Sequence, residues 1–494
     1  MFSIVNYNLL LDSLNWKYTN RYHKKLSPEL LCANNVFMIR HILLINPWIY
    51  DFAAYDLWYK PLGLLYLASL LRQNGASISW VDCLDPDHPG MRHEPDIRAP
   101  RRHPSGKGSY AEERIPKPPP LQSIPRHYHR FGITPRIFPD MMTSIPRPDV
   151  IMVTSMMTYW YPGLFETISH LKTVFPGVPV ILGGNYVTLC PEHAALSGAD
   201  FCLPGPGEIF LPPLLKDLLE MDMPELPDVG DLDSYPYPAF DLIRRRDSVP
   251  ILTSRGCPYR CSYCASHLLA GRYRRRSPIR VADEIEHWHS RLGIKNFSFY
   301  DDALLANAKE MAVPLLQEII RRQLSVQFHC PNGLHLREIT PELGALMYKA
   351  GFRTIRFGFE SSDPVRQKQT GGKVSNEEFS EAVRHLRLAG YQSQDIGVYI
   401  LCGLPGQPAD EIRESIRYVR SVGARPFLAE YSPIPGSDLW NEAVAASPYP
   451  IETEPLFHNN TLLPCKSPSL TEQVYHDLKL MTKRPSETPQ SEES

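Results

Sequence analysis

Residues 253–264 read Thr-Ser-Arg-Gly-Cys-Pro-Tyr-Arg-Cys-Ser-Tyr-Cys, which gives Cys257, Cys261 and Cys264 the spacing C-x3-C-x2-C. Three thiolates this close in sequence can converge on one small inorganic centre. Soft thiolates favour iron–sulfur clusters, zinc or cuprous copper. A four-iron cluster held by three cysteines leaves one iron without a protein ligand, and an open coordination position is typical of a catalytic centre. The alternative is a structural zinc ion with His267 as fourth ligand.

The cysteine stretch stands near the start of a repeated strand–helix pattern. Apolar runs typical of strands occur at 249–254, 296–300, 325–329, 354–359, 395–401 and 427–432. Helical periodicity separates them at 278–291, 308–323, 340–349, 375–389 and 408–422. Six such units predict a partial (βα)6 barrel of the TIM type, with the active site at the carboxyl ends of its strands.

An earlier part of the chain alternates strands and helices in another way. Short apolar runs at 42–45, 78–82, 150–155, 179–182 and 201–203 indicate strands. Helical stretches follow at 61–72, 162–174 and 191–197, the first of them with Pro61 at its start. This alternation predicts a parallel, doubly wound, Rossmann-like α/β domain.

Residues 86–148 interrupt this first domain with 14 prolines in 63 residues, and residues 89–140 carry ten Arg or Lys against five Asp or Glu. Proline density and charge leave little room for a helix or a central strand. Two interpretations stay open. The segment is either a surface insertion or a basic loop that folds over the site and meets an anionic ligand.

These patterns divide the chain into five parts. We expect an unassigned extension at 1–37, the Rossmann-like domain at 38–223, a proline-rich linker at 224–245, the barrel at 246–445 and a C-terminal extension at 446–494. The pattern is lost from Ser447, and the Pro/Ser/Glu-rich end from Arg484 is expected to be disordered.

Composition excludes several classes of protein. With 43% hydrophobic and 21% charged residues the chain is typical of a globular protein. A net charge of −2 gives no sign of a nucleic-acid partner, and no apolar stretch approaches the roughly 20 residues of a membrane span. We see no secretory signal, and the seven cysteines outside the cluster are scattered, which favours reduced thiols and a cytoplasmic location.

With Tyr263 before the last cysteine, the Cys257, Cys261 and Cys264 motif resembles the signature of radical S-adenosylmethionine (SAM) enzymes. Members of that superfamily fold as a partial (βα)6 barrel. The resemblance implies that the three cysteines hold a four-iron, four-sulfur (4Fe-4S) cluster and that SAM chelates its open iron. It also implies reductive cleavage of SAM to a 5′-deoxyadenosyl radical, a small-molecule substrate and a reductant such as a flavodoxin or ferredoxin.

Further motifs at the expected strand ends resemble SAM contacts of the same family. Asp301 and Asp302 end the second barrel strand, where the family places polar groups near the methionine amino group. The fourth strand ends in Gly358-Phe-Glu-Ser, in which Glu360 and Ser361 match a motif linked to the ribose and amino groups. The fifth ends in the loop of Gly403 and Pro405, which resembles the adenine side. The basic run Arg272–Arg276 is read as a solvated face, with carboxylate or substrate contact as the alternative.

The first domain resembles the cobalamin-binding domain of one large radical SAM subgroup. The matching pieces are Pro61-Leu-Gly-Leu, Thr154-Ser155, Gly183-Gly184-Asn185 and Gly205-Pro-Gly-Glu208. Glycines at a strand end suit close approach by the cofactor's nucleotide tail. Many cobalamin proteins carry Asp-x-His-x-x-Gly, whose histidine ligates cobalt, and this chain has no such histidine. We therefore expect a bound corrinoid without a lower imidazole, or a domain that has lost the corrinoid.

Taken together, the motifs predict a radical SAM enzyme with cobalamin as its second cofactor. Methyl transfer to an unactivated carbon or to phosphorus is the favoured outcome, although the subgroup also includes ring contractions and cyclisations. The alternatives are a cobalamin-independent radical SAM enzyme and a non-catalytic metal- or corrinoid-binding protein. Iron and sulfide content after anaerobic reconstitution distinguishes the enzyme from a protein that holds one zinc.

Overall fold

Five short apolar runs in the first part of the chain pair into one parallel sheet. The computed structural model describes residues 39–94 and 97–483. The strands are β1 (His41–Asn46), β4 (Ser77–Asp82), β8 (Val150–Val153), β9 (Val180–Gly183) and β10 (Phe201–Leu203). Their order is β10-β9-β8-β1-β4. The chain adds β4 on one side of β1 and then crosses to add β8 on the other side, so the strand order reverses between β1 and β8. The predicted doubly wound domain is confirmed, and ligands of such sheets bind at this reversal.

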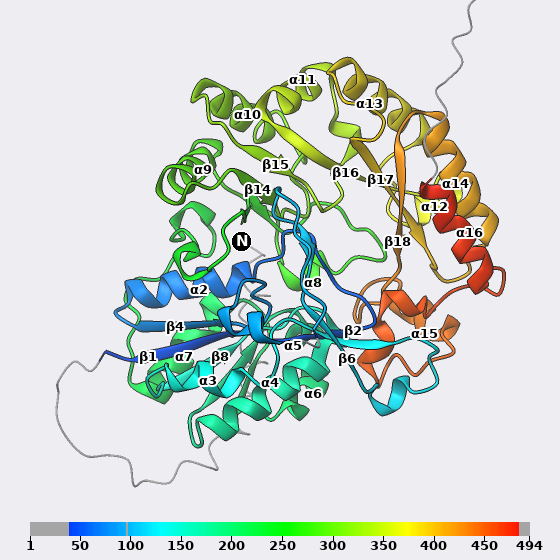
Figure 1. The fold of residues 1–494 in the computed structure, drawn as a ribbon. Helices are drawn as coiled ribbons and strands as arrows, with labels where there is room; N and C mark the ends of the chain where they lie inside the picture. Colours follow the sequence, from blue (N-terminus) through cyan, green and yellow to red (C-terminus); the bar gives the residue numbers. More distant parts are fainter. Residues whose placement is uncertain (1–38, 95–96, 484–494) are drawn as a thin grey trace, which may run out of the picture. The chain divides into compact units, whose positions relative to one another are not determined.

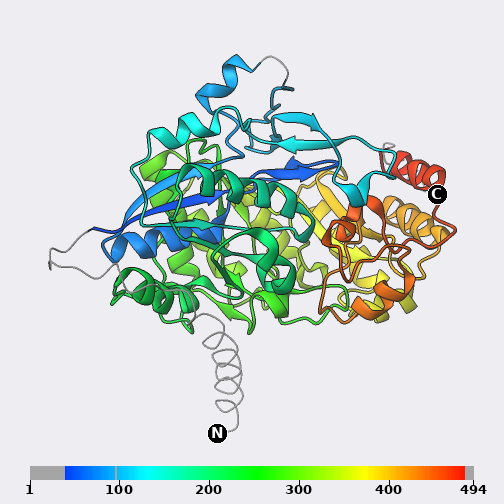
Figure 2. The same cartoon turned by 90° about the horizontal axis from the view of Figure 1, so that it is seen from below.

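Helices cover both faces of this sheet because the strand residues are apolar on both sides. They are α2 (Leu62–Gln73), α4 (Tyr161–Val174), α5 (Asn185–Leu189), α6 (Pro191–Ala194) and α7 (Gly207–Leu219). On one face Ile42 and Leu44 pack with Leu64 of α2 and Leu215 of α7. On the other face Leu43 and Ile45 share a core with α4 (Figures 1 and 2).

The second sheet has six parallel strands in chain order. They are β11 (Ser248–Ile251), β14 (Asn296–Phe299), β15 (Gln327–His329), β16 (Phe352–Glu360), β17 (Ile396–Cys402) and β18 (Arg425–Glu430). Figure 1 shows the intervening helices on its outer side, namely α9 (Pro278–Leu292), α10 (Ala312–Arg321), α11 (Pro341–Ala350), α13 (Asn376–Leu388) and α14 (Ala409–Ser421). Six strand–helix units without closure confirm the predicted partial barrel.

Alternation along β16 separates the helix side of the barrel sheet from its inner side. Phe359 stacks on Phe379 of α13, and Ile355 and Phe357 belong to the same outer core. Arg356 and Gly358 therefore lie on the inner face of the barrel sheet, because successive strand residues point to opposite faces. A register shift between Gly358 and Glu360 marks a bulge at the end of this strand.

The proline-rich insertion is folded and packs against the first domain. It contains β5 (Gly108–Ser109), β6 (Glu112–Ile115), β7 (Tyr128–Phe131) and α3 (Phe138–Thr143). The expectation that it leaves no room for a central strand is wrong, since β7 lies between β6 and β2 (Ile49–Asp51) in an antiparallel sheet. The strand fits because no proline occurs between Pro125 and Pro135.

The linker and the basic run hold each other in place. Arg276 is 8% exposed and pairs with Glu284 of α9 and with Asp233 of the linker. Arg274 donates to the carbonyl of Val229, and Arg275 pairs with Glu310. Arg276, the last residue of the run, thus forms buried ion pairs with both the linker and the barrel. These contacts correct the interpretation of the run as a solvated face.

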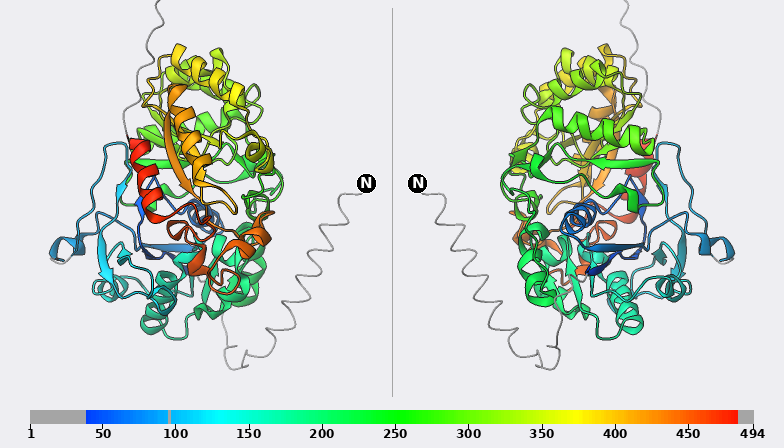
Figure 3. Two further views of the ribbon diagram at one scale, coloured as in Figure 1. Left: turned by 90° about the vertical axis from the view of Figure 1, so that its right-hand side faces the viewer. Right: turned by 90° about the vertical axis from the view of Figure 1, so that its left-hand side faces the viewer.

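The C-terminal segment is ordered up to Lys483 and packs onto the first domain. After α15 (Trp440–Ala446) it forms two short 3-10 helices, at Pro455–His458 and Asn460–Leu462, and then α16 (Glu472–Lys483). Figure 3 shows this orange and red segment beside the barrel and the first domain. Leu456 and Phe457 join the core that β1 and α4 share. The missing pattern just after Ser447 reflects 3-10 turns, which are too short to show a period. The expectation of no pattern is wrong further on, where α16 is a 12-residue α-helix.

The buried carboxylate of Asp51 holds the C-terminal segment against the first domain. It accepts hydrogen bonds from Trp160 Nε1 at 2.8 Å and from Asn459 Nδ2 at 2.8 Å. Next to it, Thr158 Oγ1 lies 2.9 Å from Nδ1 of His458. Residues in the first domain thus contact residues 300 and 408 positions later in the chain.

From Arg40 onward the described chain packs as one compact unit. The division into domains at 38–223, 224–245 and 246–445 therefore stays a prediction. The extension at 1–37 and the end at 484–494 lie outside the described residues. Among the described residues no helix is long and apolar enough to span a bilayer.

Candidate functional site

The cysteine loop leaves the barrel sheet directly after β11, at the carboxyl ends of the strands. A two-stranded ribbon, β12 (Ser254–Arg255) with β13 (Arg274–Arg275), brings the chain to Gly256, whose φ of 81° suits glycine. The loop is then fixed by Ser262, whose hydroxyl donates to the carbonyl of Gln369 and whose own carbonyl accepts from Leu439 N at 2.8 Å. Cys261 is 7% exposed, and the other two cysteines are half-buried.

The three thiols suit a cluster with several iron atoms. Burial raises the pKa of Cys257 to about 11 and also raises the pKa of Cys261. Among the described residues no three His, Cys, Asp or Glu side chains are gathered around a single metal position. In a 4Fe-4S cluster each cysteine binds a different iron, so its ligands stand further apart than those of one ion. Three soft donors on a short loop fit that group.

Glu360 stands beside the loop in a conformation that few residues adopt. Its φ is 72°, in the left-handed region, and the bulge in β16 precedes it. Its Oε1 accepts from the hydroxyl of Tyr263 at 2.7 Å and from Nζ of Lys373 at 2.8 Å. Such backbone strain is found mainly at functional sites, where the surrounding structure holds it in place. Sequence reasoning expected Tyr263 and Glu360 at the site, and the structure brings them together.

Lys373 was missed by sequence reasoning. Burial opposes its charge, but the carboxylate of Glu360 prevails and raises the pKa of Lys373 above its ordinary value. Its ammonium lies 5.6 Å from the centre of the Tyr263 ring. The residue follows Glu360 by 13 positions in a polar stretch that carries no recognisable motif. Only the fold brings this charge to the cysteine loop.

Asp301 accepts hydrogen bonds from the residues that lead into the cysteine loop. It is 4% exposed and accepts from Thr253 N at 2.9 Å, Thr253 Oγ1 at 2.6 Å and Ser254 Oγ at 2.7 Å. Burial raises its pKa to about 6, although these hydrogen bonds oppose the shift. The carboxylate is thus engaged with the segment that leads into the loop. This geometry indicates a positioning residue for the loop, and a direct contact of Asp301 with SAM stays a prediction.

The other residues expected to contact SAM lie in two places: Asp302 beside the cysteine loop, and Ser361 and Gly403 toward α14 and the C-terminal segment. Asp302 accepts from the hydroxyl of Ser266 at 2.5 Å, two residues beyond Cys264. Ser361 is fully buried and donates to Glu411 of α14, so its hydroxyl is directed away from the cysteines. Gly403 N donates to Gln407, and a Cβ at Gly403 would lie 3.0 Å from Leu463 of the C-terminal segment. The loop of Gly403 and Pro405 therefore packs beneath that segment.

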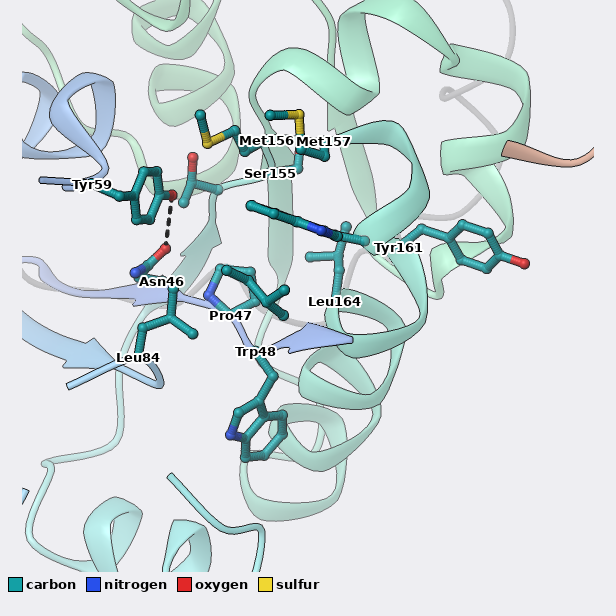
Figure 4. A pocket seen from close by; sticks show the side chains of 13 residues that line it. Asn46, Pro47, Trp48, Tyr59, Leu84, Ser155, Met156, Met157, Tyr161 and Leu164 are labelled. Carbon is teal, nitrogen blue, oxygen red and sulfur yellow. Dashed lines mark hydrogen bonds between the residues drawn. The ribbon is translucent and has the colours of Figure 1, made fainter. Parts of the chain in front are cut away.

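A pocket opens where the first sheet reverses, at the carboxyl ends of β1 and β8. It encloses about 330 Å³, part of it open to solvent. Figure 4 shows Tyr59 donating to Asn46 on one side, with Ser155 and Met156 nearby. The lining residues are Asn46, Pro47, Trp48, Ile49, Tyr59, Leu84, Thr154, Ser155, Met156, Met157, Trp160, Tyr161 and Leu164. This lining is mostly apolar and includes no histidine, and it lies at the edge of the sheet where ligands of such folds bind.

The two glycines after β9 contact Ser155, which lines this pocket. The hydroxyl of Ser155 donates to the carbonyl of Gly183 at 2.7 Å. Gly184 has a φ of 103°, and a Cβ there would lie 2.2 Å from the carbonyl oxygen of Ser155. The close contact between the loop after β9 and the loop after β8 therefore requires glycine at position 184. Any larger side chain would disturb Ser155 directly, so Gly184 is a poor position at which to test corrinoid binding alone.

Comparison with known families agrees with both sites. Residues 251–419 match the family model of the radical SAM superfamily, and residues 144–215 match that of the B12 binding domain. The chain carries both domains. The radical SAM domain implies a 4Fe-4S cluster and SAM as cofactors, and the B12-binding domain adds cobalamin.

Relatives and solved structures match this chain over different shares of its length. An uncharacterized methyltransferase of Pyrococcus horikoshii is 26% identical over 60% of this chain and 70% of its own length. Cytidylyl-2-hydroxyethylphosphonate methyltransferase of Streptomyces wedmorensis is 28% identical over 45% of each chain. The fold is similar to that of the radical SAM methyltransferase TsrM of Kitasatospora setae, with a TM-score of 0.60, 18% identity and coverage of 83% of this chain and 78% of that one.

A half-buried ion pair joins the radical SAM domain to the B12-binding domain. Arg255, two residues before Cys257, pairs with Glu208 in the first turn of α7. Its guanidinium also lies 4.6 Å from the ring of Tyr235 and 5.3 Å from the ring of Tyr66. Both charged residues occur in motifs that the sequence shows. Their pairing across 47 positions is a property of the fold alone.

Asp301 gives the stability of the protein a distinct pH dependence. Its folded-state pKa of about 6 lies above the ordinary 3.8, so between about pH 4 and 6 the native protein binds a proton that the unfolded chain releases. The free energy of unfolding should therefore fall as the pH rises through this window, by on the order of 3 kcal/mol, and stay level above it.

Denaturant titrations of the native protein and of Asp301→Asn between pH 4 and 7 measure this contribution. The difference between the two unfolding free energies should fall across the window. Asp217→Asn, at an exposed position on α7, is the control and should follow the native curve. Parallel curves for the native protein and Asp301→Asn would contradict the assignment.

Proposed function

We propose that the chain is a radical SAM enzyme that cleaves SAM reductively, with cobalamin as its second cofactor and methyl transfer to a small molecule as its outcome. The observation that carries the proposal is the placement of Cys257, Cys261 and Cys264 beside Glu360 at the carboxyl ends of the barrel strands. The two curated relatives described above are named methyltransferases, which supports the outcome. A flavodoxin or ferredoxin as reductant and a cytoplasmic location remain predictions.

The bound cofactors would supply the hard chemistry: one electron from the cluster for cleavage of SAM, and a methyl carrier from cobalamin. The chain's own residues would position them. Cys257, Cys261 and Cys264 would hold the cluster, and Asp301 would fix the start of their loop through Thr253 and Ser254. Glu360 would offer its carboxylate to the ribose or the ammonium of SAM, while the hydrogen bonds from Lys373 and Tyr263 orient it.

The pocket between β1 and β8 supports the cobalamin part of the proposal. Thr154 and Ser155 line it, and both belong to the residues that resemble the cobalamin-binding domain. The ion pair between Arg255 and Glu208 would hold the cysteine loop in a fixed relation to this domain. That relation matters because two cofactors that act on one substrate must lie within reach of each other.

The cluster assignment predicts the effect of single cysteine substitutions. Cys257→Ala, Cys261→Ala and Cys264→Ala should each abolish cluster assembly and 5′-deoxyadenosine formation, because no spare thiolate lies in the loop. Cys330→Ala is the control, since Cys330 is buried within the barrel core and should affect neither. Iron and sulfide content and product analysis under dithionite measure the result. Cleavage of SAM by Cys261→Ala would overturn the assignment.

The role of Glu360 predicts a change in SAM affinity without a change in the cluster. A charge-assisted hydrogen bond contributes roughly 1.5–3 kcal/mol, so Glu360→Gln should weaken SAM binding about tenfold to a hundredfold. The amide keeps the size of the side chain, which limits disturbance of Lys373. Equilibrium titration measures affinity, and the visible spectrum reports the cluster.

A matched control for Glu360 is Glu411→Gln. Glu411 is also a buried carboxylate of the barrel, but it pairs with Arg366 and Ser361 on the α14 side. The Glu411→Gln variant should bind SAM with an affinity within about twofold of the native value, as expected for a residue without ligand contact. Equal affinities for native protein and Glu360→Gln would remove Glu360 from the site.

The lining of the first-domain pocket predicts the spectrum of bound cobalamin. Because no histidine lines the pocket, cobalt should carry no imidazole from the protein. The electron paramagnetic resonance spectrum of the cobalt(II) state should then lack the superhyperfine splitting that a coordinating nitrogen produces. Free cobalamin with its own base coordinated is the reference. Nitrogen splitting in the protein-bound spectrum, or failure of the reconstituted protein to retain corrinoid, would contradict this part of the proposal.

A further inference from the structure

Three cations from separate parts of the chain meet inside the barrel. Arg356 of β16 and Arg425 of β18 both lie over the ring of Phe427, at 4.2 and 4.9 Å from its centre. Lys107 of the proline-rich insertion reaches the same region, where its ammonium lies 5.6 Å from the ring of Trp58. Burial, together with the charges of Arg356 and Arg425, lowers the pKa of Lys107. The three side chains therefore repel one another in a partly dry space.

No carboxylate of the described residues pairs with any of these three cations. The nearby Asp56 is engaged by Arg102, and Glu360 is engaged by Lys373. Arg356 itself donates to the carbonyl of Ile355, a neutral acceptor. Arg356 and Lys107 are half-buried, whereas Arg425 is exposed at the start of β18. Half-buried cations without a counter-charge are costly, so the arrangement favours binding of an anion.

The barrel sheet leaves room for the two guanidinium groups. Arg356, Gly397 and Arg425 lie in register on three neighbouring strands and so face the same side. A Cβ at Gly397 would lie 2.3 Å from Nη1 of Arg356. A glycine between two arginines therefore provides the space that the Arg356 guanidinium occupies.

The insertion closes the inside of the barrel from the open edge of the sheet. Trp58 donates from Nε1 to the carbonyl of Ser105 at 2.7 Å and stacks on His329 of β15 at 4.6 Å. Gly106 packs against Ser248 of β11, where a Cβ would lie 2.4 Å from the serine hydroxyl. Figure 1 shows this blue segment between β14 and β18.

The cations and the SAM site lie on the same side of β16. Glu360 follows Arg356 by four residues, which corresponds to roughly 13 Å along a strand. Gly358, Tyr399 and Phe427 form the row between them, in register across the three strands. A molecule anchored at the arginines would therefore extend past two aromatic rings toward Glu360 and the cysteine loop.

We propose that Arg356, Arg425 and Lys107 bind an anionic group, a carboxylate or a phosphoryl group, of the small-molecule substrate and so place its reacting carbon near the cysteine loop. This inference rests on the proposed function and deepens it by naming the chemical class of the substrate. It also decides between the two interpretations of the basic insertion in favour of ligand contact, with Lys107 as the contributing residue.

Calorimetric titration of the reconstituted full chain with inorganic phosphate, and separately with butanoate, tests the site at constant ionic strength. Arg356→Gln and Arg425→Gln should each weaken binding of the preferred probe about tenfold to a hundredfold, because each removes a charge-assisted contact. Arg356→Lys should retain part of the affinity. Arg353→Gln is the matched control, since Arg353 is exposed on the outer side of the same strand and should bind the probe as the native protein does.

A second variant keeps all the charges and changes only the geometry. Gly397→Ala should displace the Arg356 guanidinium and weaken binding about tenfold, whereas a diffuse electrostatic effect would leave affinity unchanged. Thermal unfolding checks that each variant is folded. Stronger binding of phosphate or of butanoate identifies the anionic group that the site prefers.

Two results would overturn the anion site: no binding of either probe by the native protein, or equal binding by native protein, Arg356→Gln and Gly397→Ala. Formation of 5′-deoxyadenosine, recorded on the same native samples, separates this failure from a failure of the proposed function. Probe binding without SAM cleavage would overturn the proposed function and leave the anion site in place.

Discussion

The carboxylate of Asp301 accepts hydrogen bonds from Thr253 and Ser254, and the cysteine loop begins three residues later. This buried contact joins the end of β14 to the end of β11, so two neighbouring strands fix the entry to the loop. A cluster with three protein ligands tolerates little movement of its thiolates, because each must meet a different iron. The loop also needs Gly371, where a Cβ would lie 3.3 Å from the Cys261 sulfur. The geometry of the cysteine loop thus depends on the hydrogen bonds that Asp301 accepts and on close packing against Gly371.

The two domains are held together by contacts that are buried or half-buried. Arg255 and Glu208 form an ion pair beneath two tyrosine rings, and the hydroxyl of Tyr300 donates to the carbonyl of Trp58. The C-terminal segment adds a third connection through Asp51 and Asn459. Breaking a buried charge pair by removing one partner is strongly destabilising, so these contacts favour one fixed arrangement of the domains. Such an arrangement suits an enzyme whose two cofactors must act on the same molecule.

Charge is distributed unevenly along the inside of the barrel. At the mouth Lys373 is neutralised by Glu360, and the pair lies next to Cys261. One row deeper come the aromatic rings of Tyr399 and Phe427, and beyond them the unpaired Arg356 and Arg425. A net charge of −2 for the whole chain conceals this local excess of positive charge. Position in the fold, rather than composition, therefore determines which ligand the barrel favours.

The sequence by itself determined the two α/β folds and predicted the three cysteines as cluster ligands. Short apolar runs that alternate with helical periods specify parallel sheets, and a C-x3-C-x2-C loop after a strand specifies its own chemistry because its ligands are neighbours in the chain. The sequence was less informative about the insertion and the C-terminal segment, where prolines and 3-10 turns conceal strand β7 and the contacts of His458.

Only the tertiary structure decided which charged groups face one another. Lys373 beside Glu360, Arg255 beside Glu208, and Arg356 beside Arg425 are separated by 13, 47 and 69 positions, and no local pattern links the members of each pair. The structure likewise decided that Asp301 accepts from Thr253 and that Ser361 donates to Glu411, although both stand at strand ends that the sequence marked correctly. The reason is physical. Strand and helix periods are set by neighbours in the chain, whereas the direction and the partner of a side chain at a strand end depend on bulges, register and packing between distant segments.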